Sequence, residues 1–311
     1  MSRAEPLLSV VIVNWNGAGY LGECLESVHG GDASGEREWI VVDNGSRDAS
    51  GALVAARLPE AEWLPLGENL GFAAAANRGL ARARGRFVLF LNPDARASEA
   101  ALAAAMRVLD DRPEVGLVSV AVRDTAGRPV PTVEPFFSLG ALLRGRAAAR
   151  ASAPGGPGPV EIDWCHGAFL LGRRADLCAL EGFDERYFLY SEDMDLCFRV
   201  HESGRTVVYL PEVSIVHEGN MAGALLLGER RAAAIFASAL LFYSGRHGKP
   251  AELVLRAAAA LTFGVRALGY RLVGSPLAQR YAALARAALR GPAGAARSAQ
   301  LARASLSGGP T

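Results

Sequence analysis

The sequence is poor in cysteine. Its 311 residues include four cysteines, and no two of them stand in CxxC spacing. A disulfide framework of the kind that stabilises small secreted domains is therefore excluded. We expect all four to be reduced thiols in the core of a cytosolic protein: Cys24, Cys165, Cys178 and Cys197.

Long hydrophobic runs are also missing. The longest run without a charged residue covers Ala232 to Gly245, 14 residues, which is short for a membrane-spanning helix. One Arg and one Glu precede the short apolar run Leu7 to Val13, so we expect no secretory leader. The sequence thus predicts a cytoplasmic protein that is not integral to a membrane, with a peripheral position on the inner face of the cell membrane as an option.

Acidic residues are scarce towards the C-terminus. From Met221 onward, twelve Lys and Arg residues stand against Glu229 and Glu252 alone, a net charge of +10. The whole chain carries +1, so residues 1–220 carry −9. This asymmetry predicts an acidic body with a basic arm that binds an anionic surface. No basic motif interleaved with aromatic residues accompanies the arginines, so we expect no nucleic-acid partner.

Strands and helices alternate along the first hundred residues. Residues 7–14, 38–44 and 86–92 are continuous apolar runs, typical of strands covered on both faces. A short strand is predicted at 61–67, and helices are predicted at 20–28, 49–58, 71–84 and 98–109. This alternation through short links predicts an α/β fold with a mostly parallel central sheet and helices on both faces.

The pattern changes after residue 115. Further strands are predicted at 115–124, 167–174 and 206–219, and a helix at 192–203. The stretch 153–159 is too rich in Pro and Gly for regular structure. Three arginines precede it, so this region is predicted to be a mobile, basic loop: Arg144, Arg146 and Arg150.

The composition after Gly219 is dominated by Ala, Leu and Arg. It predicts helices that are broken at Pro250, Pro276 and Pro292. We therefore predict two domains, a catalytic α/β domain over residues 1–220 and a basic, amphipathic helical region over residues 221–311.

Polar residues follow three of the predicted strands: Asn14, Asp43 and Asp94. Ligands of parallel α/β sheets bind beyond the carboxyl ends of the strands. We therefore expect a ligand at this end of the sheet, which we call the ligand edge. Asp94 is a suitable oxygen ligand for Mg²⁺ or Mn²⁺, aimed by the stiff Pro93; the alternative is an Asp at a helix start. Asp43 can accept hydrogen bonds from a nucleotide base or ribose; the alternative is an Asx-turn.

A second acidic group opens the predicted helix at 192–203. Glu192, Asp193 and Asp195 are suited to a helix N-terminus, where they interact favourably with the helix dipole. Neighbouring carboxylates also raise one another's pKa, which suits a general base. His217 ends a predicted strand, and it is either an ordinary surface or core histidine or a ligand.

Gly17, Gly19 and Gly22 form a GxGxxG pattern after the first strand, with Asp43 further on. That is the outline of a dinucleotide fingerprint, and it leaves an NAD-dependent oxidoreductase open as an alternative. The spacing is poor, because residues 14–16 separate the strand from the first glycine.

Seven segments together resemble the inverting family 2 glycosyltransferases of the GT-A fold, in particular the rhamnosyltransferase branch. They occur in the order of that family and cover about residues 7–220. The segments are VVIVNWNG (10–17), VVDNGSRD (41–48), NLGFAAAANRGL (69–80), FLNPDA (90–95), HGAFLLGRR (166–174), GFDERYFLYSEDMDLCFRV (182–200) and VHEG (216–219).

The resemblance implies roles for individual residues. Asp193 matches the catalytic base, with Glu192 beside it, while Asp94 matches the last carboxylate of the DxD metal motif and His217 a second metal ligand. Asn92 stands where that motif has its first Asp. The residues implied to bind the nucleotide sugar are Asn14, Asp43, Asn69, Asn77, Asn92 and Gly167. Arg173 and Arg174 are expected to face the diphosphate.

The resemblance also implies the reaction. It is the metal-dependent, inverting transfer of a sugar from a nucleotide diphosphate donor, by preference rhamnose from dTDP-rhamnose. The acceptor is a glycan or a polyprenyl-diphosphate-linked glycan in cell-surface polysaccharide synthesis. UDP-galactofuranose or a UDP-hexose remains an alternative donor, and a non-catalytic sugar-nucleotide-binding protein an alternative class. For the basic tail we expect contact with an anionic membrane surface, a helical cap on the core or a dimer face.

Overall fold

The structure is a computed structural model that describes residues 5–29, 36–144, 156, 158–219, 226–227 and 230–293. The chain divides into two compact units. Unit 1 consists of Met1–Phe136, Ala149–Glu185 and Asp193–Ala222, and unit 2 of Phe137–Ala148, Arg186–Glu192 and Gly223–Thr311. The division into functional domains at residue 220 stays a prediction.

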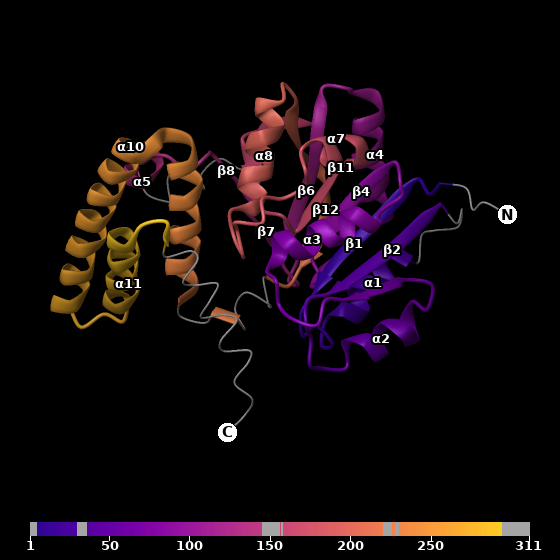
Figure 1. Cartoon of the computed structure of the whole chain (residues 1–311), viewed down its shortest axis with the longest axis horizontal. Coiled ribbons are helices and arrows are strands. Elements are labelled where there is room, and N and C mark those ends of the chain that lie inside the picture. The colour runs from indigo at the N-terminus through magenta and orange to yellow at the C-terminus, as the bar shows by residue number, and fades with distance from the viewer. Residues whose placement is uncertain are drawn as a thin grey trace. The chain divides into compact units, whose positions relative to one another are not determined.

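Unit 1 is built on one mixed sheet, in which the described residues supply ten strands (Figure 1). Its path runs β3 (Glu62–Pro65), β2 (Arg37–Asp43), β1 (Leu8–Asn14), β4 (Phe87–Leu91), β11 (Phe169–Arg173), β6 (Val115–Arg123), β12 (Thr206–His217) and β5 (Ala95–Arg96), with β7 (Pro129–Val130) on β6 and β9 (Val160–Ile162) on β12. The strands β3, β2, β1 and β4 are parallel, whereas β11 is antiparallel to both of its neighbours. The predicted α/β class and parallel core are confirmed.

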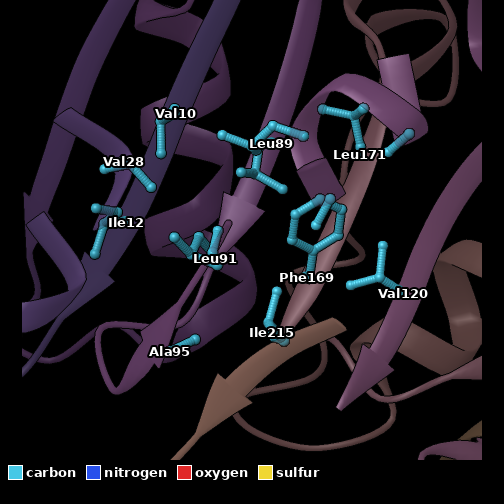
Figure 2. Close-up of a cluster of buried hydrophobic side chains, with 14 of the residues drawn as sticks. Val10, Ile12, Val28, Leu89, Leu91, Ala95, Val120, Phe169, Leu171 and Ile215 are labelled. Carbon is cyan, nitrogen blue, oxygen red and sulfur yellow. The ribbon is translucent and has the colours of Figure 1, made fainter. Parts of the chain in front are cut away.

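Helices cover both faces of this sheet. On one face, α1 (Leu21–His29), α2 (Ser50–Arg57) and α4 (Glu99–Asp111) pack on alternate strand residues in a single apolar core. Figure 2 shows part of this core, where Val10 and Ile12 lie with Leu89 and Leu91. Burial of these aliphatic side chains is the main driving force for the unit.

The opposite face carries α3 (Phe72–Arg82), α7 (Arg174–Ala179) and α8 (Glu192–Glu202). A Cβ on Gly79 of α3 would lie 2.3 Å from Val11 Cγ1, so glycine is what lets this helix approach the sheet closely. Gly116 and Gly172 allow similar approaches of Val200 in α8 and Leu177 in α7. The small elements β5 and α7 lie outside the predictions from the sequence, as does the two-stranded sheet of β8 (Val133–Glu134) and β10 (Trp164–Cys165).

Unit 2 contains α5 (Leu139–Arg144), α10 (Arg231–Leu272) and α11 (Leu277–Arg290). The helix α10 is broken at Gly248, which has φ 74° and ψ 171°, so the predicted break occurs two residues before Pro250. The predicted break at Pro276 is confirmed, because α10 ends at Leu272 and Pro276 is the N-cap residue of α11. Residue 144 lies in α5 and not in a loop, while Arg146, Arg150 and most of the predicted loop lie outside the described residues.

Two further predictions concern thiols and membrane spans. Cys24, Cys165 and Cys197 are buried free thiols, as expected, but Cys178 is exposed, so its prediction as a core residue is wrong. Cys178 is near the end of the short helix α7, whose buried side chain is Leu177. Within the described ranges, no helix combines the length and the apolar character needed to cross a membrane.

Candidate active site

Polar side chains collect at one edge of the sheet in unit 1. The parallel strands β1 and β2 end together, with Asn14 paired to Asp43 in the register. The neighbouring strand β4 ends at Leu91, which pairs with Ile12, so residues 92–94 leave the sheet at the same edge. The sequence predicted from the ends of the apolar runs that these residues lie together, and the register confirms this. That they bind a ligand there stays a prediction.

Two other strands bring residues of distant sequence to this edge. Because β11 is antiparallel to β4, its beginning lies beside the end of β4, and the Asn92 N–H donates to the carbonyl of Ala168 at 3.1 Å. Gly167 therefore belongs to the edge. The strand β12 ends at His217, which pairs with Ala95 of β5 and so comes next to Asp94.

Asp94 and His217 form a direct pair. His217 Nε2 lies 3.0 Å from Asp94 Oδ1, and the two side chains are 13% and 4% exposed respectively. The Asn92 amide nitrogen lies 3.3 Å from the same imidazole nitrogen. The Glu218 N–H donates to the Asp94 carbonyl at 3.0 Å, which fixes the end of β12 against this turn.

The Asp94–His217 pair fits a divalent cation in its donor types and its spacing. Adjacent ligands of an octahedral ion with bonds of about 2.1 Å lie about 3 Å apart, close to the 3.0 Å between Oδ1 and Nε2. In the part of the chain that the structure describes, no three His, Cys, Asp or Glu side chains gather into a fuller metal cluster. An ion held here would therefore need further ligands from diphosphate oxygens and water, as Mg²⁺ usually has.

Tyr20 and Cys24 were not predicted for this site. Burial, followed by the charges of Asp94 and Asp48, raises the pKa of Tyr20 to about 12. Burial and the Asp94 charge also raise the pKa of Cys24, whose thiol lies 3.5 Å from the Asn92 carbonyl. Both residues are close enough to interact with the Asp94 charge, Tyr20 from just before α1 and Cys24 from within it. No local sequence pattern predicts that α1 begins beside Asp94.

The ends of β1 and β2 are braced by Ser46. Its Oγ accepts hydrogen bonds from the Asn14 amide nitrogen at 3.1 Å and from the Asn16 N–H at 2.8 Å. The Ser46 N–H in turn donates to the Asp43 carboxylate at 3.1 Å, which is the turn interaction considered for Asp43. Asn14 Oδ1 is buried with no hydrogen-bond partner among the described residues.

Asn69 is hydrogen-bonded to the residue that follows Asp43, whereas Asn77 contacts a different segment. Asn69 Oδ1 accepts hydrogen bonds from Asn44 Nδ2 at 3.1 Å and from the Gly71 N–H at 3.0 Å, which connects the loop after β3 to the loop after β2. Asn77 of α3 donates to the carbonyl of Phe183 and accepts from the Phe183 N–H, both at 2.8 Å. The structure therefore shows Asn77 as a bridge to the segment at 183.

Asp193 is held beside Gly167 by two backbone hydrogen bonds. Its Oδ2 accepts from the Gly167 N–H at 2.9 Å, and its Oδ1 from the Met194 N–H at 2.8 Å. Burial raises the pKa of Asp193, while the charge of His166 and these hydrogen bonds oppose that rise. A carboxylate that is oriented, partly buried and raised in pKa has the character of a general base.

His166 and Glu134 are further residues that the sequence did not single out. His166 Nε2 lies 3.4 Å from Glu134 Oε1, and its ring lies 5.3 Å from that of Trp164. Glu134 lies in β8, and His166 follows β10, which pairs with β8. These residues are far from Asp193 in the sequence, so only the fold brings His166 close enough to act on it.

The other carboxylates of the 192–195 group differ from Asp193. Asp195 forms an ion pair with Arg199 at 2.7 Å with its side chain 1% exposed, which is a structural role. Glu192 is buried at the start of α8. Tyr190 and Ser191 before it have φ of 72° and 67°, a conformation uncommon for residues other than glycine and often kept at functional turns.

The expectation that Arg173 and Arg174 face a diphosphate is wrong. Arg173 ends β11 opposite Phe87, at the edge of the sheet away from Asp94. Its guanidinium donates to the carbonyl of Val115 at 2.7 Å and lies 3.1 Å from Asp176. Arg174 donates to the Gly85 carbonyl. The segment HGAFLLGRR (166–174) contains β11, which is antiparallel to β4. Its first residues therefore lie near Asp94, and its two arginines lie at the opposite end of the sheet.

Comparison with known sequences identifies a family. The sequence profile described as "Glycosyl transferase family 2" matches residues 9–168, about half of the chain. The chain is 30% identical over 203 residues to the N-acetylglucosaminyl-diphospho-decaprenol L-rhamnosyltransferase of Mycobacterium tuberculosis, covering 57% of this chain and 65% of that protein. It is 43% identical over 56 residues to the rhamnosyltransferase WbbL of Escherichia coli K12, covering 18% and 21%. The chain thus spans less than two thirds of these relatives.

Solved structures share the fold. The mannosyltransferase PcManGT from Pyrobaculum calidifontis, solved with GDP-Man and Mn²⁺, superposes with a TM-score of 0.57 at 21% identity. The match covers 92% of this chain and 87% of that protein. The GT-A architecture expected from the sequence, with a C-terminal helical region, is therefore confirmed.

Proposed function

Because the chain belongs to glycosyl transferase family 2, we propose that it transfers L-rhamnose from dTDP-rhamnose to a lipid-linked glycan acceptor in cell-surface polysaccharide synthesis. The observation that carries this proposal is the arrangement of two groups at one sheet edge, the Asp94–His217 pair and Asp193 beside Gly167. The two rhamnosyltransferase relatives support the choice of sugar. The name of one of them supports a glycan on a polyprenyl diphosphate as the acceptor.

Asp193 is the base in this proposal. Its carboxylate removes the proton from the acceptor hydroxyl while that oxygen attacks the anomeric carbon, and the bond to the leaving diphosphate breaks. The N–H groups of Gly167 and Met194 hold the two carboxylate oxygens in place. A single displacement of this kind inverts the anomeric centre, and it needs no covalent nucleophile on the protein.

Gly167 keeps space open next to the base. A Cβ built on this residue would lie 3.4 Å from the Asp193 Cβ and 3.6 Å from its Oδ2. Any longer side chain would therefore cover the carboxylate that must meet the acceptor. We assign the donor to the neighbouring part of the edge, with Asn14, Asp43 and Asn69 on the nucleoside side and Asn92 near the sugar and diphosphate.

Asp94 and His217 would hold Mg²⁺ or Mn²⁺, with Asn92 next to them. When bound, the ion neutralises the charge that develops on the departing diphosphate. Asn92 supplies an amide where the usual motif has a carboxylate, so the protein would offer the ion less negative charge. The imidazole of His217 would then provide a larger share of the binding.

A lipid-linked acceptor would be met at a membrane. We therefore propose a cytoplasmic protein that associates peripherally with the inner face of the cell membrane. The net charge of +10 after residue 220 supports this, since cytoplasmic leaflets carry anionic lipids.

The test is a transfer assay with purified protein, dTDP-rhamnose, Mn²⁺ and a short-chain polyprenyl-diphosphate-N-acetylglucosamine. The product expected by mass spectrometry is the acceptor with one added deoxyhexose, with the anomeric configuration inverted relative to the donor. Transfer from UDP-hexose or UDP-galactofuranose instead would replace the donor assignment. Failure of every sugar nucleotide to react with this and other glycan acceptors would contradict an enzymatic role.

A further inference from the structure

Exposed large apolar side chains are concentrated in one part of unit 2. Of the ten in the described residues, nine lie between residues 253 and 289 and the remaining one is Val130 in unit 1. The nine are Leu253, Val254, Leu261, Val265, Leu268, Leu272, Val273, Leu277 and Leu289. Soluble proteins rarely leave contiguous apolar surface of this kind uncovered unless it binds something.

Five of these residues share one side of α10. Their spacing of seven, four, three and four residues puts them in a single stripe, which we call the α10 face: Val254, Leu261, Val265, Leu268 and Leu272. Their exposure ranges from 58% to 79%. Leu255, Ala259 and Phe263 on the opposite side of the helix are buried in the core that α10 forms with α11. Figure 1 shows α11 beside α10. The second half of α10 is therefore apolar on both sides, although only one side is covered within the described residues.

The segment that carries the α10 face has charges of one sign. Residues 253–293 contain six arginines and no Asp or Glu. Arg271, Arg280, Arg286 and Arg290 are exposed. By contrast, Arg256 is partly buried and bonded to Glu252 and to the carbonyl of Ala288, so it belongs to the fold. An apolar stripe accompanied by exposed arginines complements a surface that is negatively charged and has an apolar interior.

We propose that the α10 face is a docking surface for an anionic lipid bilayer. The helix lies in the plane of the interface, its Leu and Val side chains enter the region below the headgroups, and the arginines contact lipid phosphates. The proposal identifies the surface behind the peripheral association put forward above, and it involves no step of the sugar transfer.

Charge argues against the two other occupants of this face. A second copy of the chain would bring the same arginines to the contact, since the same patch meets itself in a two-fold dimer. Residues 294–311 add Arg297 and Arg303 and no acidic residue, so they too carry positive charge. An anionic bilayer supplies both the opposite charge and the apolar phase.

The test is co-sedimentation of the full chain with vesicles, without donor or acceptor. Vesicles of phosphatidylglycerol and phosphatidylethanolamine are compared with vesicles of phosphatidylcholine. The variant Leu261→Gln/Leu268→Gln changes no charge, and its lipid partition coefficient is expected to fall by about tenfold or more, because two leucines lose their transfer into the apolar phase. Val130→Gln is the matched control, expected to bind like the wild type.

A second variant, Arg271→Gln/Arg280→Gln, separates charge from apolar insertion. It should weaken binding to anionic vesicles and make the remaining binding less sensitive to NaCl, because screening acts on the charge contribution. Circular dichroism and thermal unfolding check that each exposed substitution leaves the fold intact.

Three results would overturn the proposal. One is equal binding of the wild type to anionic and zwitterionic vesicles, and another is unchanged binding of the leucine variant. The third is a wild-type dimer in sedimentation velocity that Leu261→Gln/Leu268→Gln converts to monomer, since a second copy would then cover the face. Each result is independent of whether the protein transfers a sugar, so failure here removes this docking surface and leaves the proposed sugar transfer untouched.

Discussion

Nε2 of His166 lies 3.4 Å from Oε1 of Glu134, and the imidazole so placed acts on Asp193. Burial raises the pKa of Asp193, and the charge of His166 is the largest influence that lowers it. Glu134 orients the ring from β8. The pH range in which Asp193 is ionised thus depends on His166 and Glu134, which lie 27 and 59 positions before it in the chain.

The first prediction concerns pH dependence. A base works only when ionised, so the transfer rate falls as the pH drops through the pKa of Asp193. Replacing His166 with Gln removes the nearby positive charge, leaves the effect of burial less opposed, and should move the acidic limb of the kcat profile to higher pH. Measurement of kcat from pH 4 to 9 checks this. His29→Gln, at an exposed histidine of α1, is the control and should leave the limb where it is.

The second prediction separates Asp193 from Asp195. Asp193→Asn should lower kcat by about 10²–10⁴-fold, the usual contribution of a general base, while the Kd for the donor stays within about twofold. Asp195→Asn should instead lower the free energy of unfolding by roughly 1–3 kcal/mol, because it weakens a buried pair with Arg199. Turnover in Asp193→Asn equal to the wild type would remove this residue from the mechanism.

The third prediction concerns the pair at the end of β12. Asp94→Ala should abolish the gain in donor affinity that Mn²⁺ provides, and His217→Ala should reduce that gain. In EDTA, both variants should bind the donor about as weakly as the wild type. Isothermal titration of dTDP-rhamnose with Mn²⁺ and with EDTA measures these differences, and an undiminished Mn²⁺ effect in Asp94→Ala would contradict the ligand assignment.

The fourth prediction uses two helical glycines with opposite expectations. Gly79→Ala forces a Cβ to within 2.3 Å of Val11 Cγ1, so it should destabilise unit 1 by roughly 1–3 kcal/mol. Apart from the neighbouring backbone of α10, no atom of the described residues lies within 4 Å of a Cβ added to Gly269, so Gly269→Ala should raise the stability of unit 2 by about 0.5–1 kcal/mol. Thermal unfolding of both variants gives the signs, and a neutral Gly79→Ala would show that α3 packs less closely than described.

Much of the fold could be predicted from the sequence, because long apolar runs such as 7–14 and 86–92 leave few alternatives to buried parallel strands. The same apolar runs predicted that Asn14, Asp43 and Asp94 lie together, because parallel strands have their carboxyl ends at the same end of the sheet. The local sequence left His217 open as an ordinary histidine or a ligand, and Gly167 was assigned only from the family resemblance. No local pattern indicates that β12 ends beside β5 or that β11 runs antiparallel.

The errors have a common cause. Arg173 is the last residue of a strand, and Asp94 follows the end of another, but the antiparallel direction of β11 puts Arg173 at the opposite end of the sheet. The role assigned to Asn77 stays a prediction, and its hydrogen bonds to Phe183 are contacts that no local pattern shows. His166 and Glu134 were missed because their relation to Asp193 exists only in three dimensions. Residue types and spacing predict elements, whereas strand direction and long-range pairing decide which side chains meet.

The most direct test of the central claim is a donor-binding panel on the wild-type protein. Thermal shift is measured with dTDP-rhamnose, UDP-glucose, UDP-galactofuranose, GDP-mannose and NAD, each with Mn²⁺ and with EDTA. The proposed function predicts stabilisation by dTDP-rhamnose that is larger with Mn²⁺, because a ligand that binds only the folded state raises its stability. Stabilisation by another nucleotide sugar and not by dTDP-rhamnose would contradict the rhamnosyl assignment.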